Sequence, residues 1–148
     1  MKNTHFLIAQ KETDIRKSFP GSFIAYIDGK KAASIKDFHE QIAAAMHFPD
    51  YTGKTLDELD EMLNDLEWIK EQKVIIFIDN SAEWLSREKS EEKVLSVIDM
   101  LDATAEDWKW IDEEEEGVSK KELNIVFQDS QRIRTLLQEQ EIPFGVFS

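Results

Sequence analysis

The chain has 148 residues, with 31 Asp or Glu against 18 Lys or Arg, and its formal net charge at pH 7 is −13. Direct binding to nucleic acid is not expected from this balance, because it depends on basic side chains that displace counterions from phosphates. A basic protein is the better electrostatic match. The sequence has no cysteine and therefore no disulfide, which fits a reducing compartment. Its length is typical of one domain.

The first 22 residues contain one short apolar run, Phe6–Ala9, and then a polar segment that ends at Pro20 and Gly21. We interpret the run as an edge strand that could widen a sheet. It is shorter than the roughly 7–15 residues of a signal-peptide core, and no stretch approaches the roughly 20 apolar residues that cross a bilayer. We therefore expect a cytoplasmic protein that does not bind a membrane.

Three apolar runs rich in β-branched residues predict the strands of a sheet: Phe23–Asp28, Val74–Asp79 and Leu123–Gln128. The near-continuous apolarity of the second run is typical of a strand at the centre of a sheet or covered on both faces. Helical segments separate the runs, and parallel strands joined by helices are the simplest arrangement for such a chain. The sequence predicts an α/β fold with a three-stranded parallel core.

Two helices are expected between the first two strands. The first spans Ile35–His47, and the second spans Leu56–Ile69 after a loop at Phe48–Thr55. A third helix is expected between the second and third strands, because apolar residues there recur at helical spacing. The inward residues of the first helix are Phe38, Ile42, Ala45 and Met46, and those of the third are Val94, Val97, Ile98, Leu101 and Ala105.

The helix Leu56–Ile69 combines an apolar side with an acidic side. Gly53 permits a tight turn before it, and Thr55 with Glu58 three residues later forms a capping box at its start. At about 100° per residue, its apolar residues gather on one side and three carboxylates follow one another along the other. The apolar residues are Leu56, Leu59, Met62, Leu63 and Leu66, and the carboxylates are Asp57, Glu61 and Asp65.

Two interpretations of the acidic side stay open on the charge pattern alone. Carboxylates in the first turn, such as Asp57 and Glu58, are stabilised by the helix dipole and can be ordinary solvated residues. Glu61 and Asp65 lie beyond that effect, and no Lys or Arg follows until Lys70. Neighbouring carboxylates four residues apart repel each other at a cost of roughly 0.2–0.5 kcal/mol. Folding alone does not require this charge, so a face that binds a basic partner is the alternative.

A second acidic segment, Asp112–Glu116, follows Trp108 and Trp110. Negative charge is unfavourable at a helix C-terminus, so the third helix should end before or within this run. The run is either a solvated loop beside one packed Trp, or a second surface for a basic partner.

Residues 130–148 lie beyond the three predicted strands. Ile133, Leu136 and Leu137 indicate an amphipathic helix, and Pro143–Phe147 is a candidate for a further strand. Together with the N-terminal run, this segment would widen the sheet to four or five strands.

The segment Phe48–Leu66 resembles the signature of the barstar family, small intracellular inhibitors of secreted ribonucleases. In that family a Pro-acid-Tyr-x-Gly loop leads into a helix that reads Leu-Asp-x-Leu-x-acid-x-Leu. The resemblance covers about residues 23–103 and then the strand near residues 123–128. The matching signature residues are Pro49, Asp50, Tyr51, Gly53, Leu56, Asp57, Leu59, Glu61 and Leu63.

This resemblance implies a barstar-like fold, widened by the N- and C-terminal elements, and the function of an immunity protein. The acidic helix and its preceding loop would block the active site of a basic ribonuclease. Tyr51 and Gly53 would shape the surface and contact the partner. Asp57 and Glu61 would pair with cationic catalytic residues, and Asp60 and Asp65 would extend the negative field.

The chain differs from the family pattern at several of these positions. Thr52 replaces a second aromatic residue, Thr55 replaces Asn, Asp60 replaces a bulky apolar residue and Glu61 replaces Asp. On the next helix, Met100 takes the position where the family has another acid. Because a fold does not fix one partner, an acidic interaction or regulatory domain that binds a basic protein other than a nuclease is the alternative.

An enzyme is not expected. The sequence has no Cys nucleophile, no Gly-rich phosphate loop and no HExxH metal pair, and His5, His39 and His47 are scattered. His39 is expected to be a helix residue held against the fold rather than a catalyst. Carboxylate pairs could in principle bind Mg²⁺ or Ca²⁺ or serve a glycosidase, but here they project from a convex helix and not into a cleft. We expect no cofactor and no metal.

Overall fold

The computed structural model describes residues 6–48, 56–66, 68–109 and 121–146. Strands and helices alternate along most of this chain. In order they are β1 (Phe6–Ala9), α1 (Glu12–Ser18), β2 (Phe23–Asp28), α2 (Ile35–Met46), α3 (Leu56–Leu63), β3 (Lys73–Asp79), α4 (Glu91–Lys109), β4 (Glu122–Gln128), α5 (Gln131–Glu139) and β5 (Phe144–Val146).

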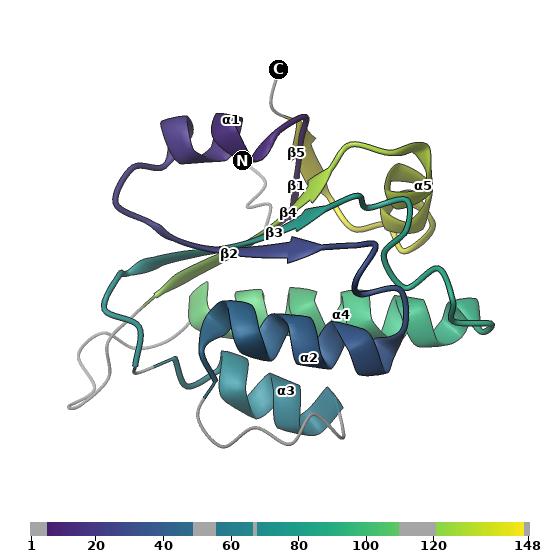
Figure 1. The fold of residues 1–148 in the computed structure, drawn as a ribbon, viewed down its shortest axis with the longest axis horizontal. Coiled ribbons are helices and arrows are strands. Elements are labelled where there is room, and N and C mark those ends of the chain that lie inside the picture. Colours follow the sequence, from purple (N-terminus) through teal and green to yellow (C-terminus); the bar gives the residue numbers. More distant parts are fainter. Residues whose placement is uncertain (1–5, 49–55, 67, 110–120, 147–148) are drawn as a thin grey trace.

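The described strands form one five-stranded sheet in the order β2-β3-β4-β1-β5, and every pairing in it is parallel (Figure 1). The three strands predicted from the apolar runs are β2, β3 and β4, and they are neighbours in the sheet. The terminal segments widen this core to five strands, as expected for residues 6–9 and 143–147. The architecture is therefore α/β with a parallel sheet.

The prediction that Phe6–Ala9 is an edge strand is wrong. β1 lies between β4 and β5, with Phe6 opposite Ile125 on one side and opposite Phe144 on the other. The side chains of Phe6 and Ile8 pack into the main core, while that of Ala9 packs into a second cluster on the other face. β5 pairs with the outer side of β1, so the backbone groups of this buried strand have partners on both sides.

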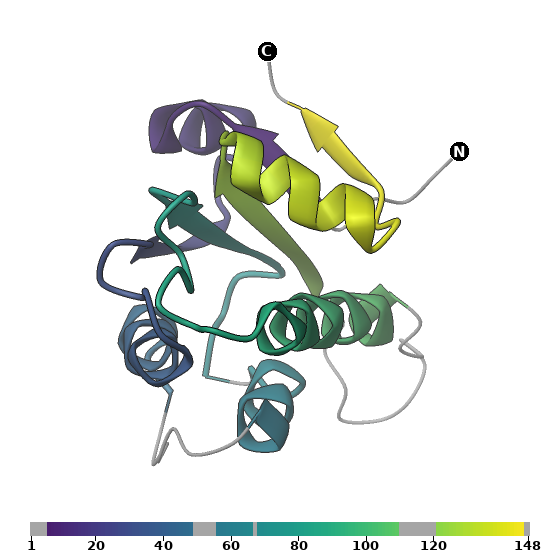
Figure 2. The ribbon, with the colours of Figure 1, turned by 90° about the vertical axis from the view of Figure 1, so that its right-hand side faces the viewer.

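Helices cover the two faces of the sheet unequally. In Figures 1 and 2, α1 lies on one face, α2 and α4 lie on the other, and α3 lies farther from the sheet than either. The main core joins the sheet to buried residues of α2, α3, α4 and α5. The smaller cluster joins Ile15 of α1 to residues of β1, β3 and β4. Sequence reasoning missed α1, because Ile15 is its single buried apolar residue in a polar segment.

The predicted first and third helices are confirmed as α2 and α4. α2 begins after Ser34, whose hydroxyl accepts a hydrogen bond from the Asp37 amide at 3.1 Å. It ends one residue before the predicted boundary, because His47 adopts a left-handed backbone conformation with φ 58°. α4 buries each of its five predicted inward residues, and Trp108 is buried as well.

The second helix is shorter than predicted. α3 ends at Leu63 and not at Ile69. The Asn64 side chain donates to the carbonyl of Asp60 at 2.8 Å, and Leu66 takes a left-handed conformation with φ 53°. An Asn side chain that competes for backbone groups and a left-handed Leu both oppose further helix, while the turn keeps Leu66 fully buried.

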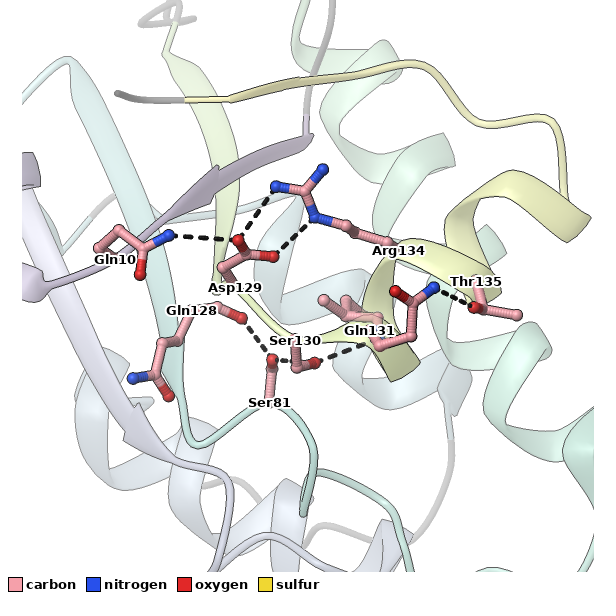
Figure 3. A network of polar contacts seen from close by, with 9 residues as sticks. Gln10, Ser81, Gln128, Asp129, Ser130, Gln131, Arg134 and Thr135 are labelled. Atoms are coloured by element: carbon pink, nitrogen blue, oxygen red, sulfur yellow. Dashed lines mark hydrogen bonds and ion pairs between the residues drawn. The ribbon is translucent and has the colours of Figure 1, made fainter.

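Hydrogen bonds at the carboxyl ends of the strands fix α5 to the sheet (Figure 3). Arg134 of α5 donates to both carboxylate oxygens of Asp129, at 2.7 and 3.0 Å. Gln10, which follows β1, donates to the same carboxylate at 3.2 Å. The Ser130 hydroxyl caps α5 by accepting from the Ile133 amide. The predicted C-terminal helix and strand are confirmed, and this network joins them to the sheet.

Leu59→Ala and Leu63→Ala should each lower the free energy of unfolding by about 2–5 kcal/mol, because both side chains are fully buried in the core. Urea unfolding measures the loss. Met62→Ala, at a half-buried position of the same helix, is the control and should cost less. If both Leu variants unfold at the urea concentration of the parent, the buried side of α3 has been assigned wrongly.

Asp129 should make stability depend on pH. Hydrogen bonds from Arg134 hold the pKa of the Asp129 carboxyl below its usual range. The charged Asp129 carboxylate therefore contributes fully to the free energy of unfolding at pH values above about 3.9, the pKa of an Asp in the unfolded chain. This contribution is lost as the pH falls through the lower pKa that Asp129 has in the folded protein. In urea titrations, the parent should be more stable than Asp129→Asn at pH 7, and this difference should shrink at acidic pH.

The control for that titration is Glu122→Gln, which removes an exposed ion pair with Lys73 and should change stability little at any pH. A difference between the parent and Asp129→Asn that stays constant from neutral to acidic pH would show that the ion pair does not contribute as described.

Candidate partner-binding surface

α3 packs with its apolar side against the rest of the protein. Leu59 and Leu63 are fully buried, as predicted, and Met62 is half-buried. The indole N–H of Trp108 on α4 donates to the carbonyl of Leu63 at 2.7 Å. This bond satisfies a carbonyl at the end of α3, which has no partner within the helix.

The opposite side of α3 is acidic and exposed. Asp57 and Glu61 lie one turn apart on the helix, and both are exposed. Asp65 is exposed too, but it lies in the turn after α3 because the helix ends early. Within the described ranges, none of these three carboxylates forms an ion pair with a Lys or Arg. The structure thus brings two of the predicted site residues together on one helical side and places the third just beyond it.

Asp60 has a different environment from its neighbours. It is half-buried, and its Oδ1 accepts hydrogen bonds from the Thr104 hydroxyl at 2.6 Å and from the Asn64 amide at 2.9 Å. Thr104 belongs to α4 and is fully buried. The Asp60 carboxylate is therefore part of the contact between α3 and α4.

The remaining predicted site residues, Tyr51 and Gly53, lie outside the described residues. So do the rest of the loop before α3, including Thr55, and the acidic run Asp112–Glu116. Trp108 is the packed Trp that was expected beside this run, with 3 % of its surface exposed.

His39 lies on α2 and is buried. Burial lowers the pKa of its imidazole, and the nearby charge of Glu58 on α3 opposes this effect only in part. The burial of His39 agrees with the prediction that it is held against the fold.

The segment after α3 is anchored by two side chains that sequence reasoning missed. The indole of Trp68 donates to the carbonyl of Met46 at 2.8 Å, which joins this segment to the end of α2. The ammonium group of Lys121 is buried and donates to the carbonyls of Ile69 and Glu71, at 2.6 and 2.8 Å. Burial lowers the pKa of Lys121. No sequence pattern identifies such a lysine, because its partners are backbone groups far away in the chain.

A second group of polar residues lies at the carboxyl edge of the sheet, where ligands bind in many open α/β folds. Tyr26 donates to the Asp79 carboxylate at 2.6 Å, and the Asn80 amide donates to Asp28 at 2.9 Å. The Asn80 bond lowers the pKa of Asp28. Among the described residues, no group of three His, Asp or Glu side chains is placed to hold a metal ion.

An open cleft of about 430 Å³ lies between the segment before α4 and α5. Two of its charged residues already hold parts of the fold together. Arg132 donates to the carbonyls of Ser81 and Trp84, and Glu88 accepts from the Ile35 amide at 2.8 Å. The cleft is separate from α3. Across the described ranges, every helix is too short or too polar to span a bilayer.

Comparisons with known proteins agree with this fold. The chain shares its fold with a solved structure, "Structure of the Aeropyrum Pernix ORC2 protein (ADPNP-ADP complexes)", at a TM-score of 0.57 and 13% sequence identity. The match covers 97% of this chain but only 41% of that one, so the chain spans less than half the length of the solved protein. A comparison with curated proteins gives no match. The family model described as Barstar (barnase inhibitor) matches residues 22–128, which is more than half of the sequence, and the chain therefore belongs to the barstar family.

Proposed function

We propose that this protein is an immunity protein that blocks the active site of a basic ribonuclease with α3 and the loop before it. The observation that carries the proposal is the exposed pair Asp57 and Glu61 on α3, in a chain that belongs to a family of barnase inhibitors. A ribonuclease must present Lys, Arg or His side chains to the phosphates of RNA. A rigid helix with outward carboxylates can occupy those positions.

We assign a role to each residue of the proposed site. Asp57 and Glu61 pair with cationic catalytic groups, and Asp65 extends the negative field from the turn after the helix. Tyr51 and Gly53, in the loop before α3, shape the surface and contact the partner. Asp60 is also part of the proposed site, although its carboxylate is bonded to α4. The protein acts in the cytoplasm, without a cofactor or an enzymatic activity of its own.

Nucleotide binding is not proposed, although the solved ORC2 protein is described in complexes with ADPNP and ADP. A phosphate loop places Gly-rich backbone between a strand and a helix N-terminus. Here Gln10 and Lys11 join β1 to α1. The carboxyl edge beside them carries Asp28, Asp79 and Asp129, whose charge disfavours phosphates.

The alternative is an acidic regulatory domain that binds a basic partner other than a nuclease. Capture of the partner from the native cell with the intact chain, followed by mass spectrometry and an RNA cleavage assay, separates the two. A captured ribonuclease whose activity falls in proportion to added protein supports the proposal. A captured basic protein without nuclease activity supports the alternative.

The association rate with the captured ribonuclease should fall steeply between low and physiological ionic strength. The Debye length shrinks to about 8 Å at physiological salt, which screens the field of the acidic side before contact. Stopped-flow mixing at several salt concentrations measures this rate. An association rate that does not change with salt would contradict electrostatic steering by α3.

Glu61→Gln should weaken binding by about 2–5 kcal/mol, because it leaves a cationic group of the partner desolvated and unpaired. Its effect on stability should not exceed about 0.5 kcal/mol, since Glu61 is exposed and its neighbours Asp57 and Asp65 lose a repelling charge. Titration calorimetry and urea unfolding measure the two quantities. Asp57→Asn is a companion test, although that charge also interacts with the helix dipole.

Glu141→Gln is the matched control for this test, because it removes the same charge at an exposed position after α5 and should leave binding unchanged. If inhibition survives both Glu61→Gln and Asp57→Asn, the family's contact residues do not act at these positions. The search for the inhibitory surface would then move to Asp112–Glu116.

A further inference from the structure

The side chain of Thr104 on α4 bonds to a carboxylate of α3. Its hydroxyl lies 2.6 Å from Asp60 Oδ1 and 2.9 Å from the carbonyl of Met100, one turn earlier on α4. A hydroxyl has a single proton, and a charged carboxylate is the stronger acceptor. The Met100 carbonyl is the usual acceptor for a Thr inside a helix. The short distance to Asp60 therefore marks a bond between helices that the α4 backbone does not require.

Apolar packing alone leaves the rotation of α3 about its own axis weakly defined. The burial of Leu59 and Leu63 is non-directional, whereas hydrogen bonds require a narrow range of distances and angles. Asp60 precedes Glu61 by one residue, or about 100° around the helix, and follows Asp57 by three residues. A bond that holds Asp60 against α4 therefore determines where Asp57 and Glu61 point.

A second bond from α4 fixes the position of α3 along its axis. Trp108, one turn after Thr104, donates to the carbonyl of Leu63, and Leu63 is three residues after Asp60. Two bonds, about one turn apart on both helices, define the rotation and the translation of α3 relative to α4.

We propose that Asp60 is a positioning residue, which acts through Thr104 to orient Asp57 and Glu61 toward the partner, and does not itself pair with a cation of the partner. The proposal rests on the proposed function only in that α3 faces a partner. Asp60 Oδ1 already accepts two hydrogen bonds. Thr104 is fully buried, so a change there does not touch the partner directly and acts through the groups it bonds, Asp60 on α3 and the Met100 carbonyl on α4.

A double-mutant cycle with the captured ribonuclease tests this assignment. Asp60→Ala, which removes the acceptor, and Thr104→Val, which removes the donor, should each raise the dissociation rate by about tenfold. The double variant should be no worse than the poorer single one, because both remove the same bond. The association rate and its dependence on salt should stay within about twofold of the parent, since Asp57 and Glu61 still supply the steering field.

Two further variants separate positioning from a general loss of structure. Thr104→Ser keeps the hydroxyl and should retain the dissociation rate of the parent, which also provides the test if the Val variant does not fold. Ser96→Ala removes an exposed side-chain bond to the Glu92 carbonyl on the same helix and should change neither rate. If Asp60→Ala instead lowers the association rate and its salt dependence while Thr104→Val has no effect, Asp60 contacts the partner and the proposal is wrong.

An experiment on the free protein tests the positioning without a partner. In hydrogen exchange followed by mass spectrometry, Asp60→Ala and Thr104→Val should speed exchange of the amides in residues 57–63, and Ser96→Ala should not. Parent-like exchange in both variants would overturn the positioning role. Faster exchange in a protein that inhibits no ribonuclease would uphold it, and the proposed function alone would fail.

Discussion

Parallel pairing of the strands is the constraint on which the remaining structure depends. Parallel neighbours cannot be joined by a tight hairpin, so each connection must carry the chain from the carboxyl end of one strand to the amino end of the next. Between β2 and β3, the 12 residues of α2 span about 18 Å. This is close to the roughly 20 Å length of the six-residue β2. α2 can complete the return by itself, and α3 is an additional helix that packs on α4.

A helix with this placement has an outward side that the core does not use. The charge on that side has a physical cost. Asp57 is partly compensated by the positive end of the helix, but Glu61 lies beyond the first turn and repels Asp57 by roughly 0.2–0.5 kcal/mol. α3 spans eight residues, and isolated helices of this length are marginal in water. Its stability therefore comes from the burial of Leu59 and Leu63 and from the hydrogen bonds that α4 donates. These interactions offset the repulsion between the carboxylates. An acidic surface is maintained on a helix that local sequence preferences alone would not keep folded.

Much of this architecture could be predicted from hydrophobic periodicity. The continuous apolar run Val74–Ile78 indicated a strand at the centre of a sheet or covered on both faces, and β3 is buried on both faces and lies between β2 and β4. The spacing of Val94, Val97 and Leu101 identified the buried side of α4. These predictions succeed because the position of a residue within a regular strand or helix determines whether its side chain faces the core.

The wrong or missed predictions depend on contacts between residues far apart in the chain or on local side-chain hydrogen bonds, which a periodic pattern does not contain. The early end of α3 depends on how Asn64 bonds to Asp60 and on the buried position of Leu66. The interior position of β1 depends on β5, a partner supplied from the far end of the chain. The Thr104 bond to Asp60 joins residues that are 44 apart in sequence. From the sequence alone, Asp60 could therefore not be distinguished from the other acidic residues of the helix. For the candidate site, the sequence indicated which residues are acidic and exposed, but not which of them is bonded to another helix.

The position of β1 has a consequence for the order of folding. Its neighbours in the sheet are β4 and β5, and the Gln10 side chain meets Asp129 across 119 residues of sequence. Contacts of such long range are made late, because the entropy of a long loop must be lost before they form. During synthesis on the ribosome, β2 and β3 can pair before β4 has been made. Until then, the strand that carries Phe6 and Ile8 has no partner in the sheet. A fragment that stops before β4 would leave an apolar strand without a partner, and such strands favour aggregation.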